Sequence, residues 1–162
     1  HTNFDTAVDG MNDMLARKLN LANIHAQKEE IDSSCFLRIG DTTPMDLEEY
    51  VQRGLEKLNE PGARVVGNPS KKIKKVGIVG GAGASELMLA KNLGCDCLIT
   101  GEIRHNNAID AIENNFAIIE VSHSIEALFK EYIKKELEQI LDGVEIVTSK
   151  VEKDPFRWIS KK

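Results

Sequence analysis

The chain has 162 residues, which is long enough to build one substantial hydrophobic core, and we expect a single domain. Its 41% hydrophobic and 29% charged residues are ordinary for a globular protein, and no apolar run reaches the roughly 18–20 residues of a membrane-spanning helix. The net charge of −5 argues against a general nucleic-acid binder, because such a protein neutralises phosphates with a positive surface.

Patterns in the first half of the chain predict two helices and two short strands. Apolar residues at helical spacing predict a helix over residues 9–19, capped by Asp9. Short strands are expected over residues 35–39 and 64–66. Between them, Thr43 and Pro44 predict a helix start, because Thr is a common cap and Pro suits the first helical position. The core stripe of this second helix is expected to be Leu47, Tyr50, Val51, Leu55 and Leu58.

The second half alternates regularly between strands and helices. Strands are predicted over residues 76–79, 97–99, 117–121 and 144–147. Helices are predicted over residues 85–93, 106–114 and 124–141. Short links between such elements imply parallel strands joined by right-handed crossovers. The sequence therefore predicts an α/β fold with a mixed, largely parallel sheet and crossover helices.

Three cysteines give little sign of a disulfide framework. Cys35, Cys95 and Cys97 are an odd number, which favours a reducing, cytoplasmic setting. Cys95 and Cys97 also permit a metal-binding interpretation, with both thiols on one face of a strand. No second pair of cysteines completes a tetrahedral site, so packing in the core is the better account.

The chemistry-bearing residues follow three consecutive predicted strands. The first strand is followed by the glycine loop of residues 80–83, the second by Glu102 and His105, and the third by His123 and Glu126. Ligands bind beyond the carboxyl ends of the strands in an open parallel sheet. We therefore expect these four side chains to lie near one another at one edge.

The glycine loop permits two interpretations. A dinucleotide-binding motif would need a small residue where the chain has Glu86, and a carboxylate there is poorly suited to a pyrophosphate. Tight turns and a close backbone approach, around an anionic substrate at the following helix start, explain the glycines better.

His123 and Glu126 are three residues apart at a predicted helix start, so both side chains can lie on one face. Imidazole and carboxylate together suit zinc, iron or manganese. The plainer alternative is a helix-entry histidine followed by a carboxylate that favours the first turn. The pair alone favours this plainer alternative.

Four motifs, in their order, resemble one known family. They are HTNFD at residues 1–5, GGAG at 80–83, TGEIRH at 100–105 and SHSIE at 122–126. With PMDLEEYV and DPFRW, they resemble the Nif-three-like proteins, also called GTP cyclohydrolase 1 type 2 homologues. The resemblance covers essentially the whole chain, and it implies a dinuclear metal centre in a homohexamer.

The resemblance also assigns roles to individual residues. Asp5, His123 and Glu126 match the family's metal ligands, and His1 matches a histidine adjacent to the site. Glu102 and His105 match a segment facing the same cavity, which makes them candidate proton carriers. The implied cofactors are two divalent ions per subunit of the full-length protein: zinc, iron or manganese.

Two departures from the family pattern stand out. Ser122 replaces the glycine before the late histidine. The family's earlier paired-histidine segment, which contributes two further ligands, has no counterpart here. Residues 1–162 are therefore interpreted as one α/β domain region, the C-terminal portion of a longer protein, with HTNFD at the edge of the strand-end metal site.

The function expected from the resemblance is a metal-dependent hydrolase. Its substrate would be a nucleotide or a related small molecule, and the family name suggests the opening of the GTP purine ring. One alternative is a non-enzymatic, metal-binding oligomeric scaffold or regulatory interaction protein. A third interpretation is a nucleotide-binding oxidoreductase that uses the glycine loop.

Overall fold

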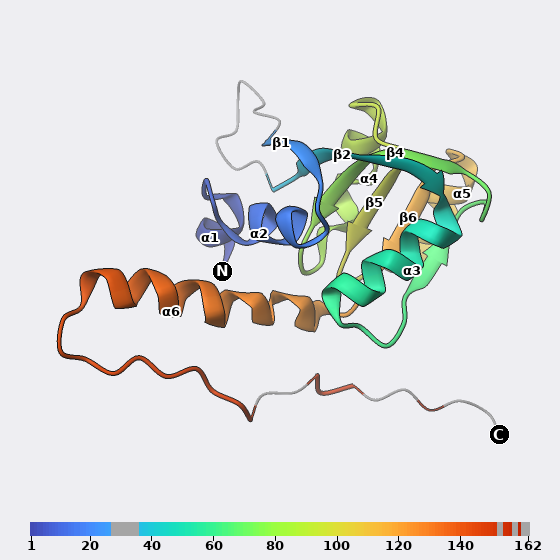
Figure 1. Ribbon diagram of the computed structural model, residues 1–162. Helices are drawn as coiled ribbons and strands as arrows, with labels where there is room; N and C mark the ends of the chain where they lie inside the picture. Colours follow the sequence, from blue (N-terminus) through green and yellow to red (C-terminus); the bar gives the residue numbers. More distant parts are fainter. Residues whose placement is uncertain (27–35, 152–153, 157–158, 160–162) are drawn as a thin grey trace.

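The computed structural model describes residues 1–26, 36–151, 154–156 and 159, and a six-stranded sheet forms its centre (Figure 1). Along the sheet the strands lie in the order β1-β2-β4-β5-β6-β3. Their bounds in chain order are β1 (Ala22–Ala26), β2 (Arg38–Asp46), β3 (Arg64–Val66), β4 (Lys72–Val79), β5 (Cys97–Thr100) and β6 (Ala117–Glu120).

The three central strands are parallel and the outer pairings are antiparallel. Val79 pairs with Thr100, and Thr100 pairs with Glu120, so β4, β5 and β6 end at the same level. Their continuous apolar runs suit parallel strands covered on both faces. The predicted α/β fold with a mixed sheet and crossover helices is confirmed, and its parallel part is the centre of the sheet.

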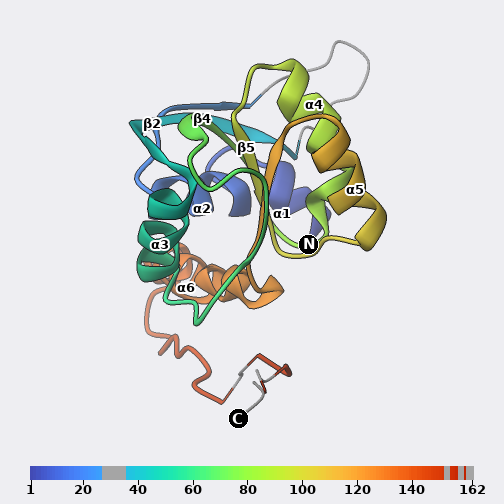
Figure 2. The ribbon, with the colours of Figure 1, turned by 90° about the vertical axis from the view of Figure 1, so that its right-hand side faces the viewer.

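Helices cover both faces of the sheet, with α3 on one side and α4 and α5 on the other (Figure 2). The helices are α1 (Thr2–Thr6), α2 (Met11–Lys18), α3 (Leu47–Leu58), α4 (Leu87–Asn92), α5 (His105–Glu113) and α6 (Leu128–Ile140). Two short 3-10 helices, η1 (Gly83–Glu86) and η2 (His123–Ala127), lead into α4 and α6. None of the helices in the described part of the chain is long and apolar enough to cross a membrane.

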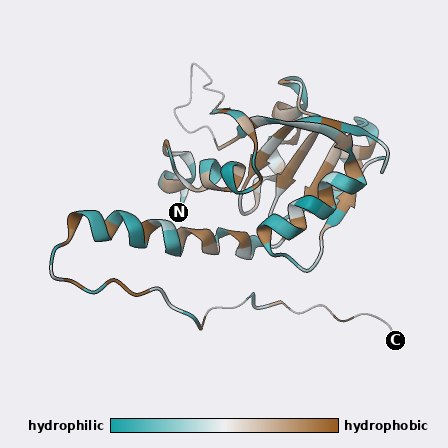
Figure 3. Ribbon diagram, in the orientation of Figure 1, coloured by the Kyte–Doolittle hydropathy of each residue, from teal (hydrophilic) through white to brown (hydrophobic). Residues whose placement is uncertain are grey.

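The sheet separates two hydrophobic clusters. Leu15, Tyr50 and Ile78 belong to the cluster under α2 and α3. Leu87 and Leu98 belong to the cluster under α4 and α5. Figure 3 shows apolar strands at the centre and polar outer turns on α3, as expected for an amphipathic helix. The predicted core stripe of α3 is confirmed: all five of its residues belong to the first cluster or pack against it.

Two expected helix starts are wrong. Gly10 rather than Asp9 stands at the cap of α2, and Asp9 pairs with Arg17 instead. Thr43 and Pro44 lie inside β2, within an irregularity of its pairing with β4. Pro has no N–H to give to a ladder, and a bulge is one of the few places in a sheet that tolerates it. The helix α3 starts after this stretch, at Leu47.

Other strand expectations need correction. The strand β1 was not predicted, and residues 144–147 form no strand in the described chain. Residue 35 of the strand expected over 35–39 lies outside the described residues, and β2 begins at Arg38. Cys95 and Cys97 are buried, as the packing interpretation expected, but they belong to different hydrophobic clusters, so their thiols do not share a face.

Candidate functional site

The carboxyl ends of β4, β5 and β6 meet the glycine loop at one edge of the sheet, and Thr100 holds the loop in place. Its buried hydroxyl donates to the Gly81 carbonyl at 3.0 Å and accepts from the Gly83 amide at 2.9 Å. The Gly101 amide donates to the same Gly81 carbonyl at 2.8 Å. Because the Gly83 amide is used within the protein, it cannot cradle a pyrophosphate, which argues further against the dinucleotide interpretation.

Glu102, His123 and Glu126 form a cluster at this edge, which we call the strand-end cluster. His123 Nδ1 lies 2.5 Å from Glu102 Oε1, and Nε2 of the same ring lies 3.5 Å from Glu126 Oε2. A carboxylate can only accept, so Nδ1 carries a proton, and the neutral ring keeps the lone pair of Nε2 on the side of Glu126. The spacing of three residues in η2 places both side chains on one face, as predicted.

The cluster shifts the pKa values of two of its members. The hydrogen bond that His123 donates to Glu102 raises the pKa of His123 above its ordinary value. Burial opposes this shift, and the charge of Glu126 adds to it. Burial raises the pKa of Glu126. The His123 ring opposes that shift, whereas the Asp5 carboxylate increases it. Asp5 therefore lies close enough for its charge to act on Glu126.

The glycines of the loop leave room for these side chains. A Cβ on Gly81 would lie 2.9 Å from Glu126 Oε1 and 3.3 Å from His123 Nε2. A Cβ on Gly80 would lie 3.1 Å from the same carboxylate oxygen. Gly81 also has a φ of +57°, a conformation that disfavours side chains. The backbone of the loop thus approaches His123 and Glu126 closely, and the anionic substrate expected at this loop stays a prediction.

A buried asparagine connects Asp5 to the glycine loop. Asn12, in α2, donates to the Asp5 carbonyl at 3.2 Å and to the Phe36 carbonyl at 2.9 Å. Its Oδ1 accepts from the Gly80 amide at 2.7 Å. Its three contacts join the N-terminal segment, the residue stretch just before β2 and the glycine loop that follows β4. Asn12 therefore positions two parts of the candidate site at once.

A buried arginine and the aromatic ring of Phe4 fix α1 as well. Arg38 donates from Nη2 to the carbonyls of Thr6 and Ala7, at 3.1 and 2.9 Å, and its Nε lies 3.0 Å from Asp13 Oδ1. On the other side of α1, the ring of Phe4 makes an edge contact with Phe129 of α6, with centroids 5.1 Å apart. These contacts hold the segment that carries Asp5 against β2 and α6.

The two remaining predicted residues lie outside the cluster. His105 is the exposed first residue of α5, and within the described residues no hydrogen bond or ion pair joins it to Glu102 or His123. His1 precedes α1, is exposed, and its ring contacts the Thr2 hydroxyl at 2.9 Å. The cluster thus unites Glu102, His123 and Glu126, with Asp5 nearby.

The cluster does not amount to a complete metal site. Among the described residues, no group of three or more His, Cys, Asp or Glu side chains could hold a metal ion. The donor types at the cluster nevertheless fit a divalent transition metal, because imidazole and carboxylate are its common ligands. A full coordination sphere would need further ligands beyond His123 and Glu126.

Sequence reasoning missed Asn12 and Arg38. Arg38 lies between two apolar residues of a strand, and Asn12 shares helical spacing with Leu15 and Leu19. Both are almost fully buried: 1% and 2% of their surfaces are exposed. A polar residue in such a place needs partners. The polar residue within an apolar pattern was visible in the sequence. Its hydrogen-bond partners were not, because they lie far away along the chain.

The fold and the site define a class of protein. It is an α/β domain whose strand ends carry a histidine between two carboxylates, beside a glycine loop. The chain belongs to the family Duf34/NIF3 (NGG1p interacting factor 3), whose model matches residues 1–155. The resemblance found in the motifs is therefore confirmed.

Relatives of known sequence carry the name GTP cyclohydrolase 1 type 2 homolog. One from Staphylococcus epidermidis is 36% identical over 118 residues, which cover 70% of this chain and 32% of that protein. One from Halalkalibacterium halodurans is 33% identical over 119 residues, which cover 71% and 32%. The chain thus spans about a third of the length of these relatives.

Solved structures share the fold. A hypothetical protein of Staphylococcus aureus has a TM-score of 0.87 at 26% identity, over 98% of this chain and 67% of its own. A Bacillus cereus protein related to NIF3 also has a TM-score of 0.87, at 22% identity, over 98% and 72%. These likenesses support the mixed α/β architecture described above.

Proposed function

We propose that the strand-end cluster binds divalent metal ions and that the protein is a metal-dependent hydrolase. The observation that carries this proposal is the orientation of His123 between Glu102 and Glu126. Metal-binding histidines typically donate their other ring N–H to a carboxylate, which fixes the tautomer and the orientation of the ring. The contact of Glu102 with Nδ1 has this form, and it leaves Nε2 for an ion.

Under this proposal His123 and Glu126 would hold one ion, and Asp5 would supply carboxylate oxygens to the metal centre. The ions would be zinc, iron or manganese, two per subunit of the full-length protein. A pair of such ions supplies an activated water and a clamp for the group under attack. The remaining ligands would come from outside the described residues.

The residues of this chain would orient the ligands and move protons. Glu102 accepts from His123 through Oε1, and the same side chain lines a cavity of about 330 Å³ next to the cluster. Its carboxylate is therefore placed to exchange a proton with a molecule in that cavity. His105 remains a second candidate proton carrier, at the start of α5.

The same cavity supports a nucleotide or a related small molecule as substrate. Arg104 and Ser85 line it together with Asn106 and Asn107. A guanidinium and small polar groups are suited to phosphate oxygens. The names of the relatives suggest GTP cyclohydrolase chemistry, and we propose hydrolysis of a C–N, ester or phosphate bond. We also propose a homo-oligomer, a hexamer by family resemblance, which light scattering of the full-length protein would test.

A screen of the purified full-length protein tests the enzymatic part. GTP, other nucleotides and simple phosphate esters would be incubated with and without added zinc, iron or manganese. We expect metal-dependent product formation from at least one nucleotide, and loss of that activity on chelation. Metal binding without turnover of any of these compounds would contradict the hydrolase proposal.

A non-enzymatic interaction protein is the second candidate, and one observation favours it. Val65 on the edge strand β3 and Ile112 on α5 are 41% and 64% exposed, and both line a groove of about 400 Å³. Exposed apolar side chains beside an unpaired strand edge suit a protein partner. If the protein is an interaction protein, Ile112→Ser should weaken its complex with the partner and leave metal binding unchanged. If the protein is a hydrolase, the Ile112→Ser variant should hydrolyse its substrate at the full wild-type rate.

A further inference from the structure

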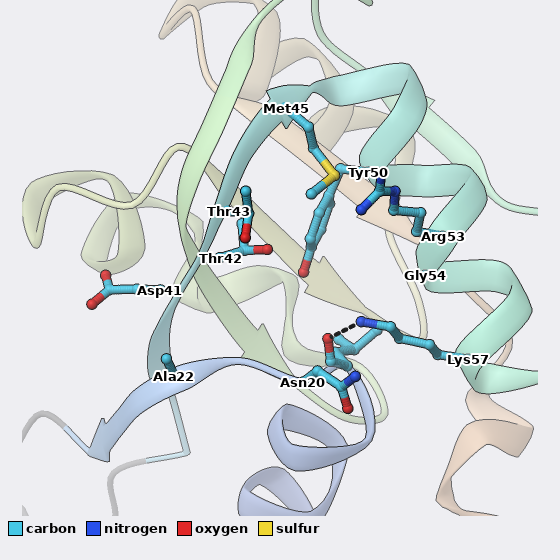
Figure 4. Close-up of a pocket in the computed structure, with 11 residues that line it drawn as sticks. Asn20, Ala22, Asp41, Thr42, Thr43, Met45, Tyr50, Arg53, Gly54 and Lys57 are labelled. Carbon is cyan, nitrogen blue, oxygen red and sulfur yellow. Dashed lines mark hydrogen bonds between the residues drawn. The ribbon is translucent and has the colours of Figure 1, made fainter.

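A cavity of about 460 Å³ lies between α3, β2 and the turn from α2 to β1 (Figure 4). Its volume lies within the range of small-molecule sites, about 300–1,000 Å³. None of its residues belongs to the strand-end cluster. The lining residues that bear on its chemistry include Thr42, Thr43, Met45, Tyr50, Arg53 and Lys57.

An irregularity in β2 shapes one wall of this cavity. Asp41 pairs with Lys75 of β4, and Met45 pairs with Ile73, so four steps along β2 correspond to two along β4. Thr42 and Thr43 lie in this bulge. Bulges re-aim side chains and occur often beside binding sites. The bulge therefore presents two hydroxyls where a regular strand would continue its ladder.

The cavity also contains a buried polar atom without a partner. Tyr50 is 4% exposed, and its phenol oxygen makes no hydrogen bond within the described residues. Figure 4 shows this oxygen pointing into the space between Thr42 and Lys57. Burial raises the pKa of Tyr50 well above its ordinary value, so the phenol keeps its proton and needs an acceptor. An unpaired buried hydroxyl is costly, and its presence calls for an explanation.

Two cationic side chains, Lys57 and Arg53, line the same space. Lys57 donates one hydrogen bond to the Leu19 carbonyl at 2.7 Å, which leaves two of its N–H groups for other acceptors. Arg53 forms an ion pair with Glu49 at 2.6 Å. Because this ion pair is exposed, it contributes little to stability. The lining carboxylate, Asp41, accepts from Asn23 at 2.8 Å and points away from Tyr50 in Figure 4. The lining of the cavity thus carries two cations and one carboxylate, and the carboxylate is engaged by Asn23.

We propose that this cavity binds a small molecule through an oxyanion, a carboxylate or a phosphate group. The Tyr50 hydroxyl and the Lys57 ammonium donate to the oxyanion, with Arg53 at the mouth. The apolar remainder of the molecule contacts Leu19 and Met45. Such a ligand supplies the acceptor that Tyr50 lacks.

Titration of the full chain with two probes, inorganic phosphate and acetate, tests the proposal. Binding would be followed by ¹⁵N chemical shifts in a Tris chloride buffer, and the melting temperature would be followed in parallel. We expect saturable binding of at least one probe, with shifts confined to the cavity. Tyr50→Phe keeps the ring and removes only the hydroxyl, and it should weaken that binding about tenfold, because a hydrogen bond to a charged group is lost.

The behaviour of the variant without a probe separates this role from a purely structural one. Because the hydroxyl has no partner within the described chain, Tyr50→Phe should melt at the same or a higher temperature in the absence of an oxyanion, and should lose most of the rise that the probe gives the wild type. Lys57→Met should weaken binding too, whereas Lys135→Met, which removes an exposed charge on α6, should not. Absence of saturable binding, or equal binding by the wild type and Tyr50→Phe, would overturn the proposal.

Discussion

Two polar groups of residues lie near the N-terminal segment, and they differ in how completely they are satisfied. The buried group consists of Asn12, Asp13 and Arg38. Asn12 and Arg38 donate hydrogen bonds to backbone carbonyls, Asn12 accepts one from a backbone amide, and Arg38 forms an ion pair with Asp13. In the strand-end cluster, the side chains of Glu102 and His123 are 58% and 50% exposed. One ring nitrogen of His123 is fixed and the other faces a carboxylate at 3.5 Å. The first group holds the fold together, and the second offers ligands.

The largest effect is expected from breaking the buried group. Arg38→Met removes the partner of Asp13 and leaves that carboxylate buried, which should lower the free energy of unfolding by about 3–5 kcal/mol. Urea denaturation measures this loss. Arg53→Met is the matched control, because its ion pair with Glu49 is exposed and worth less than about 1 kcal/mol. Similar losses for both variants would mean that the buried pair has no special role.

A smaller effect is expected at the residue that links the two groups. Asn12→Ala leaves the Gly80 amide and the Phe36 carbonyl without this partner and should lower the free energy of unfolding by about 1–3 kcal/mol. It should also weaken metal binding, because the glycine loop and Asp5 lose their common support. Asn92→Ala, at the exposed end of α4, should change stability by less than about 0.5 kcal/mol. Unchanged metal affinity in a folded Asn12→Ala protein would show that Asn12 serves stability alone.

The smallest change in stability is expected at Glu102, whose effect falls on a pKa instead. Removing its carboxylate in Glu102→Ala should lower the pKa of His123, because this hydrogen bond is the main cause of its raised value. An NMR titration of the His123 ring measures the change, with Glu113→Ala as a distant control. A His123 pKa that is the same in both variants would rule out Glu102 as the group that orients the ring.

The same pKa fixes the direction of two pH effects. The pKa of His123 in the folded protein is raised above 6.5, so the protonated ring stabilises the fold below pH 6.5. This contribution is lost as the pH rises through the raised pKa. A metal ion needs the neutral ring, so its affinity should increase over the same rise.

The sequence predicted those features that depend on local pattern. The apolar stripe around Tyr50 and Val51 predicted α3, and continuous apolar runs predicted β5 and β6, because burial follows directly from such spacing. The short distance from His123 to Glu126 was also sufficient to place both on one face.

Features that depend on distant contacts could not be predicted. Thr43 and Pro44 fit a helix start and a bulge equally well, and only the pairing of β2 with β4 decides between them. Residues 144–147 have the composition of a strand, but a strand needs a neighbour, and this segment lies outside the sheet. Asn12 contacts Gly80 across 68 positions of sequence, which no local pattern records.

Metal titration of two glutamine variants tests the central claim most directly. Glu126→Gln keeps the size of the side chain but removes a charged ligand, and Glu138→Gln makes the same change farther along the chain, in α6, where the carboxylate lies 3.6 Å from Lys134. Loss of even an outer partner of a ligand typically costs about 10–100-fold in affinity. We therefore predict that Glu126→Gln in the full-length protein binds zinc or manganese at least about tenfold more weakly than the wild type, while Glu138→Gln binds as the wild type does. Equal affinities for the two variants would contradict the assignment of Glu126 as a metal ligand.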